Sequence, residues 1–323
     1  MLERAHELAR RVDQPYTDGV LAMCDGVSAF LLGEFAKAQR TLDDAQQILR
    51  DATGVAWEID IAQHYELGAL AWLGRFEELR RRAPRVMREA DARGNLYVSA
   101  MLRTGLANGL IQLQRDQVAQ ARGDAAEGLA RWPQRGFRLS HYWNLYTNAQ
   151  IDLYAGDAGS AHARMTRGWP SVKAAPQRRV QLSRVMITEL RIRCLLAAAR
   201  QRARRAPSEA HALLDQARRG IRRLTRERVG WASALAGLLE AGMTHLRGDA
   251  TTACDQLAQA IAALDAADLA LFATAARRRL AQLCGGDRGA ELSRQAAAWF
   301  THSGVVRPDA MTAMLTPAFE PGG

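Results

Sequence analysis

The cysteine and histidine side chains are the ones in this sequence best able to bind a metal or attack a substrate, and their spacing favours neither role. The chain of 323 residues contains seven histidines and four cysteines, Cys24, Cys194, Cys254 and Cys284. The cysteines lie far apart and form no Cys-x-x-Cys pair, and no two histidines have the spacing of ligands on one helix face. We therefore expect no metal site and no disulfide framework, and we interpret the cysteines as reduced thiols.

Catalytic motifs are also missing from the sequence. It contains no GxxxxGK[ST] phosphate loop, no HExxH motif and no GxSxG nucleophile turn. Acidic pairs such as Asp43-Asp44 and Glu77-Glu78 are interpreted as solvated helix faces, not as paired catalytic carboxylates. We therefore expect a protein that is not an enzyme and binds no cofactor.

Hydrophobic patterning argues against a membrane-spanning or secreted protein. The longest uncharged apolar stretch, from Val229 to Leu239, is too short to cross a bilayer. The N-terminal residues MLERAHELARR are charged and lack the apolar centre of a signal peptide. With 48% hydrophobic residues, the chain can still form a sizeable core. We expect a cytoplasmic protein without a transmembrane segment.

Repeated turns indicate the elements that must position any functional side chain. Gly33, Gly74, Gly156 and Gly248 each follow one apolar helical pattern and precede another, as expected where a helix ends. Gly33 and Gly74 are 41 residues apart, and two further steps of 41 reach Arg115 and then Gly156. A fixed period of this size is typical of stacked helical hairpins.

The period predicts an all-α fold, a right-handed superhelical solenoid of about seven hairpins similar to tetratricopeptide repeats. The array is expected to span residues 1–302, with turns near residues 33, 74, 115, 156, 205, 248 and 286, followed by a C-terminal tail over 303–323. The first helices of the hairpins are expected at 17–32, 57–73, 96–113, 138–155, 177–204, 230–247 and 269–284. The second helices are expected at 35–51, 76–93, 117–131, 158–168, 208–227, 250–267 and 287–302. Residues 1–12 resemble a second helix whose first helix is absent, and Pro317-Ala318-Phe319 could cap the last hairpin or lie free.

The run from His141 to Asn148 combines aromatic and polar residues and is the best candidate for a binding surface. In a tetratricopeptide register, six residues would face the concave groove: Met23, His64, Trp143, Tyr146, Gln150 and His245. An aromatic floor with polar neighbours could bind an extended peptide or a helix of a partner protein. The alternative interpretation is that these rings fill the core between repeats.

The basic residues form a second candidate surface. The net charge is +10, and the segment from Arg178 to Arg228 contains 15 arginines against four acidic residues. Ten of these arginines flank one predicted turn: Arg200, Arg202, Arg204, Arg205, Arg218, Arg219, Arg222, Arg223, Arg226 and Arg228. Such a patch could bind an acidic protein, nucleic acid or an anionic membrane surface, or could simply be a solvated helix face. Nucleic acid is disfavoured because no aromatic residue lies between Trp169 and Trp231 to stack on bases.

Several phrases resemble the C-terminal tetratricopeptide-like array of certain bacterial eukaryotic-type serine/threonine kinases. They include Leu70-Ala71-Trp72-Leu73-Gly74, Ile151-Asp152-Leu153-Tyr154-Ala155-Gly156-Asp157 and the terminal segment from Ser303 to Phe319. The resemblance covers most of the chain, but the glycine-rich loop, the ATP-contacting lysine and the catalytic loops of the kinase domain are absent. It therefore implies no catalytic residue, only a scaffold that recruits partners or regulates a kinase domain in cis or in trans.

These observations lead to one function hypothesis and two alternatives. The leading hypothesis is a non-enzymatic protein–protein interaction scaffold in bacterial signalling, which binds partners along a concave groove. The first alternative is the C-terminal regulatory or substrate-recruiting part of a serine/threonine kinase, which would make this chain a piece of a longer protein. The second is nucleic-acid binding through residues 178–228.

Overall fold

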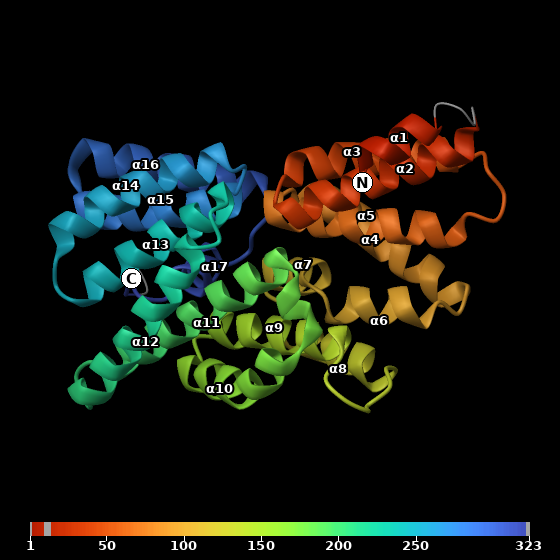
Figure 1. Cartoon of the computed structure of the whole chain (residues 1–323). Helices are drawn as coiled ribbons and strands as arrows, with labels where there is room; N and C mark the ends of the chain where they lie inside the picture. The colour runs from red at the N-terminus through yellow and green to blue at the C-terminus, as the bar shows by residue number, and fades with distance from the viewer. Residues whose placement is uncertain (1, 10–13, 321–323) are drawn as a thin grey trace.

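The computed structural model describes residues 2–9 and 14–320, and within them the chain is all-helical (Figure 1). These residues form 17 α-helices and one short 3-10 helix, η1 (Pro176–Arg179), and they include no β-strand. The predicted all-α class is therefore confirmed. None of the described helices is long and apolar enough to span a membrane.

Most helices lie within a few residues of the predicted ranges. The helices expected to open hairpins are α2 (Pro15–Leu32), α4 (Ala56–Leu73), α9 (Leu139–Tyr154), α11 (Gln181–Arg202), α13 (Gly230–Leu246) and α15 (Ala270–Cys284). The helices expected to close them are α3 (Phe35–Leu49), α5 (Phe76–Ala92), α8 (Val118–Ala130), α10 (Ala158–Ala174), α12 (Pro207–Thr225), α14 (Ala250–Ala266) and α16 (Gly286–His302). At the N-terminus, α1 (Leu2–Ala9) lies within the helix expected at 1–12, whose last residues fall outside the described part.

The helix expected at 96–113 is interrupted in the structure. It forms two helices, α6 (Leu96–Thr104) and α7 (Leu106–Gln114), separated by Gly105 in an extended conformation. A Cβ atom at this position would lie 2.5 Å from the carbonyl oxygen of Met101, so only glycine fits the break. Apolar periodicity continues across Gly105, which explains why the sequence predicts one continuous helix.

Consecutive helices pack closely because small residues lie where they cross. A Cβ atom on Gly26 of α2 would lie 2.5 Å from Cγ of Leu42 on α3, and one on Gly168 of α10 would lie 2.6 Å from Cδ2 of Leu145 on α9. Because glycine has no side chain, the leucine of the facing helix can fill the space between the two helices.

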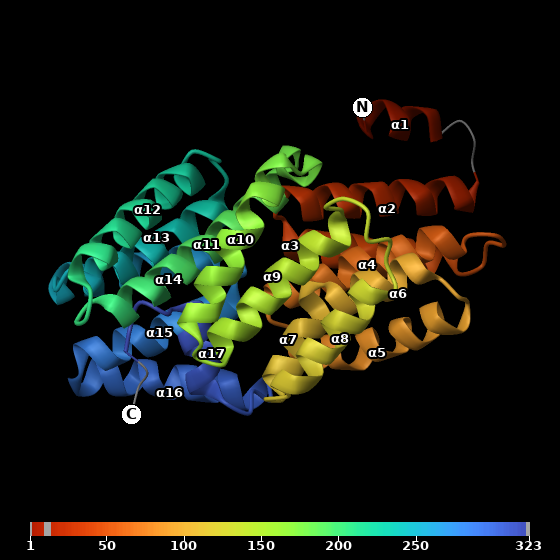
Figure 2. The same ribbon diagram turned by 90° about the horizontal axis from the view of Figure 1, so that it is seen from below.

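Aromatic residues join the two ends of the chain. Trp72 of α4 stacks on Phe35 of α3 and on Phe272 of α15, with ring centroids 5.3 and 5.8 Å apart, and Trp231 of α13 contacts Trp72 edge-on at 5.5 Å. Near this cluster, Phe76 of α5 meets Trp299 of α16. The C-terminal helices therefore pack against the N-terminal helices, as both ribbon views show (Figures 1 and 2).

The segment expected to be a tail contains a further helix, α17 (Pro308–Leu315). It packs against α9 and α15 and lies near the centre of the view in Figure 1. Met311, Met314 and Leu315 of this helix are buried. The C-terminal segment is thus part of the core.

Candidate functional site

The residues predicted to face a groove are distributed over several environments, and two of them line a common cavity. His64 of α4 and Trp143 of α9 both line a cavity of about 220 Å³. Its walls also include residues of α2, α6, α7, η1 and α11. Most of the lining is apolar, with Phe30, Leu31, Met101, Leu102, Leu106, Leu139 and Leu182 among the contributing side chains.

Three polar atoms on the walls of this cavity have no partner. They are Nδ1 of His64, Nε1 of Trp72 and Oε1 of Gln177, each out of contact with solvent and without a hydrogen bond in the described chain. Burial lowers the pKa of His64 from 6.5 to about 4, so its ring is neutral near pH 7. An apolar cavity with unpaired polar atoms can hold an apolar group and hydrogen-bond to a polar one beside it.

The break between α6 and α7 shapes one wall of the cavity. Gly105, Leu106 and Ala107 all line it, so the start of α7 faces the cavity rather than continuing α6 along its original path. On the facing helix α4, a Cβ atom on Gly68 would lie 3.0 Å from the Phe30 ring. These small residues keep the space open. The sequence contains both glycines, but it does not indicate that Gly68 and Gly105 line the same cavity.

An aromatic strip leads from the cavity to the surface. Tyr97 lines the cavity, and its ring lies 5.7 Å from Trp57 and 5.8 Å from Trp132 between centroids. The Trp57 side chain is 55% exposed, and the lining residue Val180 is 37% exposed. The sequence does not indicate this strip because Trp57, Tyr97 and Trp132 lie far apart in the chain.

Tyr146 and Gln150 lie in the interior, in the environment that the alternative interpretation predicted. Tyr146 is 1% exposed and Gln150 is 4% exposed. Gln150 accepts a hydrogen bond at 3.3 Å from the fully buried Arg193, which also donates to Glu189 at 2.9 Å. Burial raises the pKa of Tyr146 and of Glu189, while the positive charge of Arg193 opposes both shifts. These residues organise a buried polar network and do not reach the surface.

The C-terminal segment packs against α11, α13 and α15. Arg193 donates to the carbonyl oxygen of Met314 at 3.1 Å, and Arg279 donates to Oγ1 of Thr316 at 2.9 Å and to the carbonyl oxygen of Glu320 at 2.7 Å. Arg200, one of the predicted basic-patch residues, donates to the carbonyl oxygen of Phe319. His245, predicted to line the groove, stacks on the Phe319 ring. The sixth groove residue, Met23, is half-buried on α2 and packs against the core.

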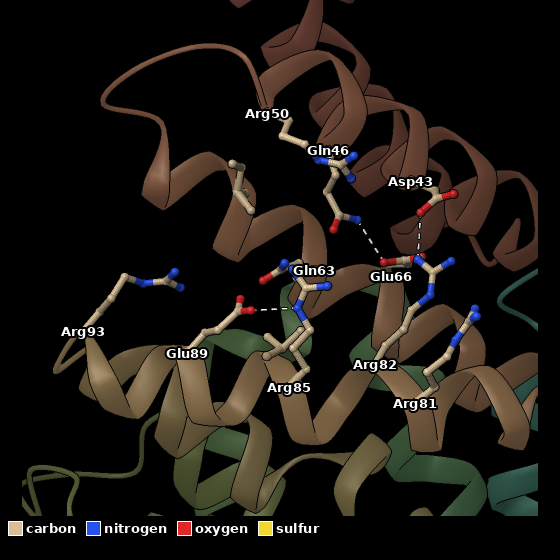
Figure 3. A pocket seen from close by; sticks show the side chains of 12 residues that line it. Asp43, Gln46, Arg50, Gln63, Glu66, Arg81, Arg82, Arg85, Glu89 and Arg93 are labelled. Atoms are coloured by element: carbon tan, nitrogen blue, oxygen red, sulfur yellow. Dashed lines mark hydrogen bonds and ion pairs between the residues drawn. The ribbon is translucent and has the colours of Figure 1, made fainter.

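A charged cleft of about 580 Å³ lies between α3, α4 and α5 (Figure 3). At its floor the buried Glu66 accepts a hydrogen bond from Gln46 at 2.9 Å and is paired with Arg82, which also binds Asp43 at 2.7 Å. Burial raises the pKa of Glu66, and the contacts with Gln46 and Arg82 oppose the shift. On the rim, Arg85 pairs with Glu89 at 2.7 Å. These ion pairs engage every acidic residue that lines the cleft and link three helices, which is a structural role.

The predicted basic patch divides into paired and unpaired arginines. Arg202 pairs with Glu209 at 3.1 Å, and Arg218 pairs with Asp215. Arg219 and Arg223 line a further cavity between α10, α11 and α12. The other predicted residues form no ion pair within the described part of the chain: Arg204, Arg205, Arg222, Arg226 and Arg228.

No group of three or more histidine, cysteine, aspartate or glutamate residues within 2–9 and 14–320 has the geometry to hold a metal ion.

The four cysteines are free thiols. Burial raises the pKa of Cys254, and the charge of Cys284 adds to this shift. Comparison of the sequence with protein-family models and with curated proteins finds no match, so the resemblance to the kinase-associated array stays a prediction.

Proposed function

We propose that this protein is a non-enzymatic interaction module whose inner face binds an apolar side chain of a partner protein. The observation that carries the proposal is the apolar cavity lined by His64 and Trp143. It lies at a junction of helices from several repeats, and an exposed aromatic strip adjoins it. Aromatic anchors in desolvated pockets supply much of the binding energy of protein interfaces.

The size of the cavity favours a single side chain over a cofactor. Pockets for small molecules commonly measure about 300–1,000 Å³, whereas this cavity measures about 220 Å³. A leucine, phenylalanine or tryptophan side chain of a peptide suits such a space. His64, Trp72 and Gln177, which line this cavity, each carry a polar side-chain atom without a hydrogen bond in the described chain.

We also propose that the helices form a right-handed superhelix of about seven tetratricopeptide-like hairpins. The close packing of α2 with α3, α11 with α12 and α13 with α14 supports the hairpin arrangement. The contact of Trp72 with Phe272 supports a superhelix that curls until its ends meet. In such an array the cavity lies on the concave side. The family resemblance supports a role in bacterial signalling, with a kinase domain in cis or in trans among the partners.

A cavity-filling variant tests the binding proposal. Ala107 lines the cavity and is 7% exposed, so Ala107→Phe would place a ring in the space reserved for the partner. Peptides are selected from a random display library against the wild-type chain, and their affinities are then measured for both proteins. We expect selected peptides that share one large apolar residue and bind the variant at least about tenfold more weakly, a loss of about 1.4 kcal/mol.

The matched control is Ala36→Phe, because Ala36 lies on α3 and does not line this cavity. Circular dichroism establishes that both variants keep the helical content of the wild type. The proposal is wrong if no peptide is enriched, or if the selected peptides bind Ala107→Phe as tightly as they bind the wild type.

A further inference from the structure

The cavity between α10, α11 and α12 has an unusual set of charges. It measures about 290 Å³, and its lining includes Lys173, Arg191, Arg219 and Arg223. No aspartate or glutamate is among the described residues that line it. The charged cleft of Figure 3 differs in this respect, because acidic residues there face the arginines. The α10–α12 cavity therefore concentrates positive charge without an internal counter-charge.

The acidic residues on α12 and just after it are paired with other arginines. Asp215 on α12 pairs with Arg218, Glu209 pairs with Arg202, and Glu227 pairs with Arg184 at 2.7 Å. None of the four cations of the cavity forms an ion pair with any described residue. Their mutual repulsion is thus relieved only by solvent or by a bound anion.

Arg191 is held in place within this cluster. Its guanidinium carbon lies 4.1 Å from the centroid of the Trp169 ring, a cation–π contact that fixes the plane of the group. The side chain is half-buried. Burial and the charges of Arg223 and Arg219 lower the pKa of Arg191. Because Arg191, Arg219 and Arg223 line the same cavity, their guanidinium groups can act on one anion.

We propose that this cavity binds a small anion that carries two adjacent phosphoryl groups, as in a diphosphate. Each phosphoryl group carries about −1.5 to −2 charges near neutral pH, so two groups match the four cations better than one. Arginine presents parallel N–H donors to phosphate oxygens, and lysine binds them as a point charge. The volume of about 290 Å³ suits a ligand of this size. This site is separate from the cavity lined by His64 and Trp143, and neither proposal depends on the other.

Calorimetric titration of the full chain with inorganic pyrophosphate tests the proposal. The variant Arg219→Ala/Arg223→Ala removes two of the four cations. The matched control Arg222→Ala/Arg226→Ala removes the same charge from neighbouring exposed positions that do not line the cavity. We expect one bound pyrophosphate per chain, a weakening of about tenfold or more in the cavity variant, and a change of about twofold or less in the control.

Two further titrants separate the outcomes. Inorganic phosphate should bind more weakly than pyrophosphate, and equal affinity would contradict the requirement for two phosphoryl groups. A single-stranded RNA oligonucleotide tests the alternative of a nucleic-acid surface, in which both double variants would weaken binding equally. Absence of pyrophosphate binding, or equal losses in the cavity variant and the control, would overturn the proposal. All four substituted arginines are exposed, and circular dichroism verifies that both variants fold.

Discussion

The ring of Phe319 stacks on the imidazole of His245, with ring centroids 4.7 Å apart and 22° between the planes. Next to this contact, a Cβ atom on Gly242 would lie 2.8 Å from Cβ of Ala318, so α13 and the C-terminal segment are in close contact. The chain itself thus covers His245, one of the residues that were predicted to face a partner. The cavity lined by His64 and Trp143 lies beside other helices and is not lined by this segment.

The C-terminal segment should contribute strongly to stability. Phe319 is 3% exposed, so Phe319→Ala would leave a cavity in the core and should lower the free energy of unfolding by about 3–5 kcal/mol. Urea denaturation followed by circular dichroism measures this change. The control is Val306→Ala in the same segment, because Val306 is 62% exposed and its truncation should cost less than about 0.5 kcal/mol. Equal stability of Phe319→Ala and the wild type would show that the segment is not part of the core.

Trp143 and Tyr146 should respond differently to truncation, although they are adjacent on one face of α9. Tyr146 is buried, so Tyr146→Ala should lower the free energy of unfolding by about 3–5 kcal/mol. Trp143 is half-buried and lines the cavity, so Trp143→Ala should cost less stability and should reduce binding of library-selected peptides. Urea denaturation and peptide titration of both variants measure the two effects. A larger stability loss for Trp143→Ala would mean that its ring is mainly a core residue.

His64 should make stability depend on pH. Its pKa is 6.5 in the unfolded chain and about 4 in the fold, so the unfolded state binds the proton more tightly and stability falls as pH decreases from about 6.5 to 4. Lowering the pH from about 7.5 to 5 should reduce the free energy of unfolding by about 2 kcal/mol through the protonation of His64.

The histidine contribution is isolated by His64→Gln, which keeps a polar side chain but does not titrate. The pKa values of His141, His162 and His245 are also lowered, mainly by burial, so the variant should retain a smaller pH dependence of the same sign. An unchanged pH dependence in His64→Gln would show that His64 is accessible to solvent in the fold.

The cysteines should differ in reactivity according to their burial. Cys284 is exposed, whereas Cys194 is fully buried and burial raises its pKa to about 12. The thiolate is the reactive form, so a thiol reagent such as DTNB should modify Cys284 in the folded chain and Cys194 only after unfolding. Peptide mass analysis of the labelled protein identifies the sites, and Cys284→Ser should remove the fast phase. Fast labelling of Cys194 would indicate that α11 opens readily.

The helices themselves could be predicted from local sequence. Gly33, Gly74, Gly156 and Gly248 have φ angles of 84°, 70°, 78° and 89°, the left-handed conformation that ends a helix at low cost for glycine. Apolar residues at helical spacing then place the helices on either side of each turn. Turn geometry and helical periodicity act between residues a few positions apart, so one sequence is enough to detect them.

The break at Gly105 could not be predicted from the same signals. The residues on both sides of it follow helical periodicity, and the extended conformation depends on how α6 and α7 pack against neighbouring helices. The neighbouring positions of Lys173 and Arg223, and of Trp72 and Phe272, also depend on the packing of helices that are far apart in the sequence.

The sequence by itself therefore determined the helices, the turns between them and the concentration of arginine in one segment. Only the tertiary structure decided which of the candidate side chains line a cavity, which are buried, and where the C-terminal segment lies. The physical reason is that the contacts between helices far apart in the sequence depend on how whole helices pack against one another. Long-range neighbours such as His245 and Phe319 are set by this tertiary packing, which no local pattern encodes.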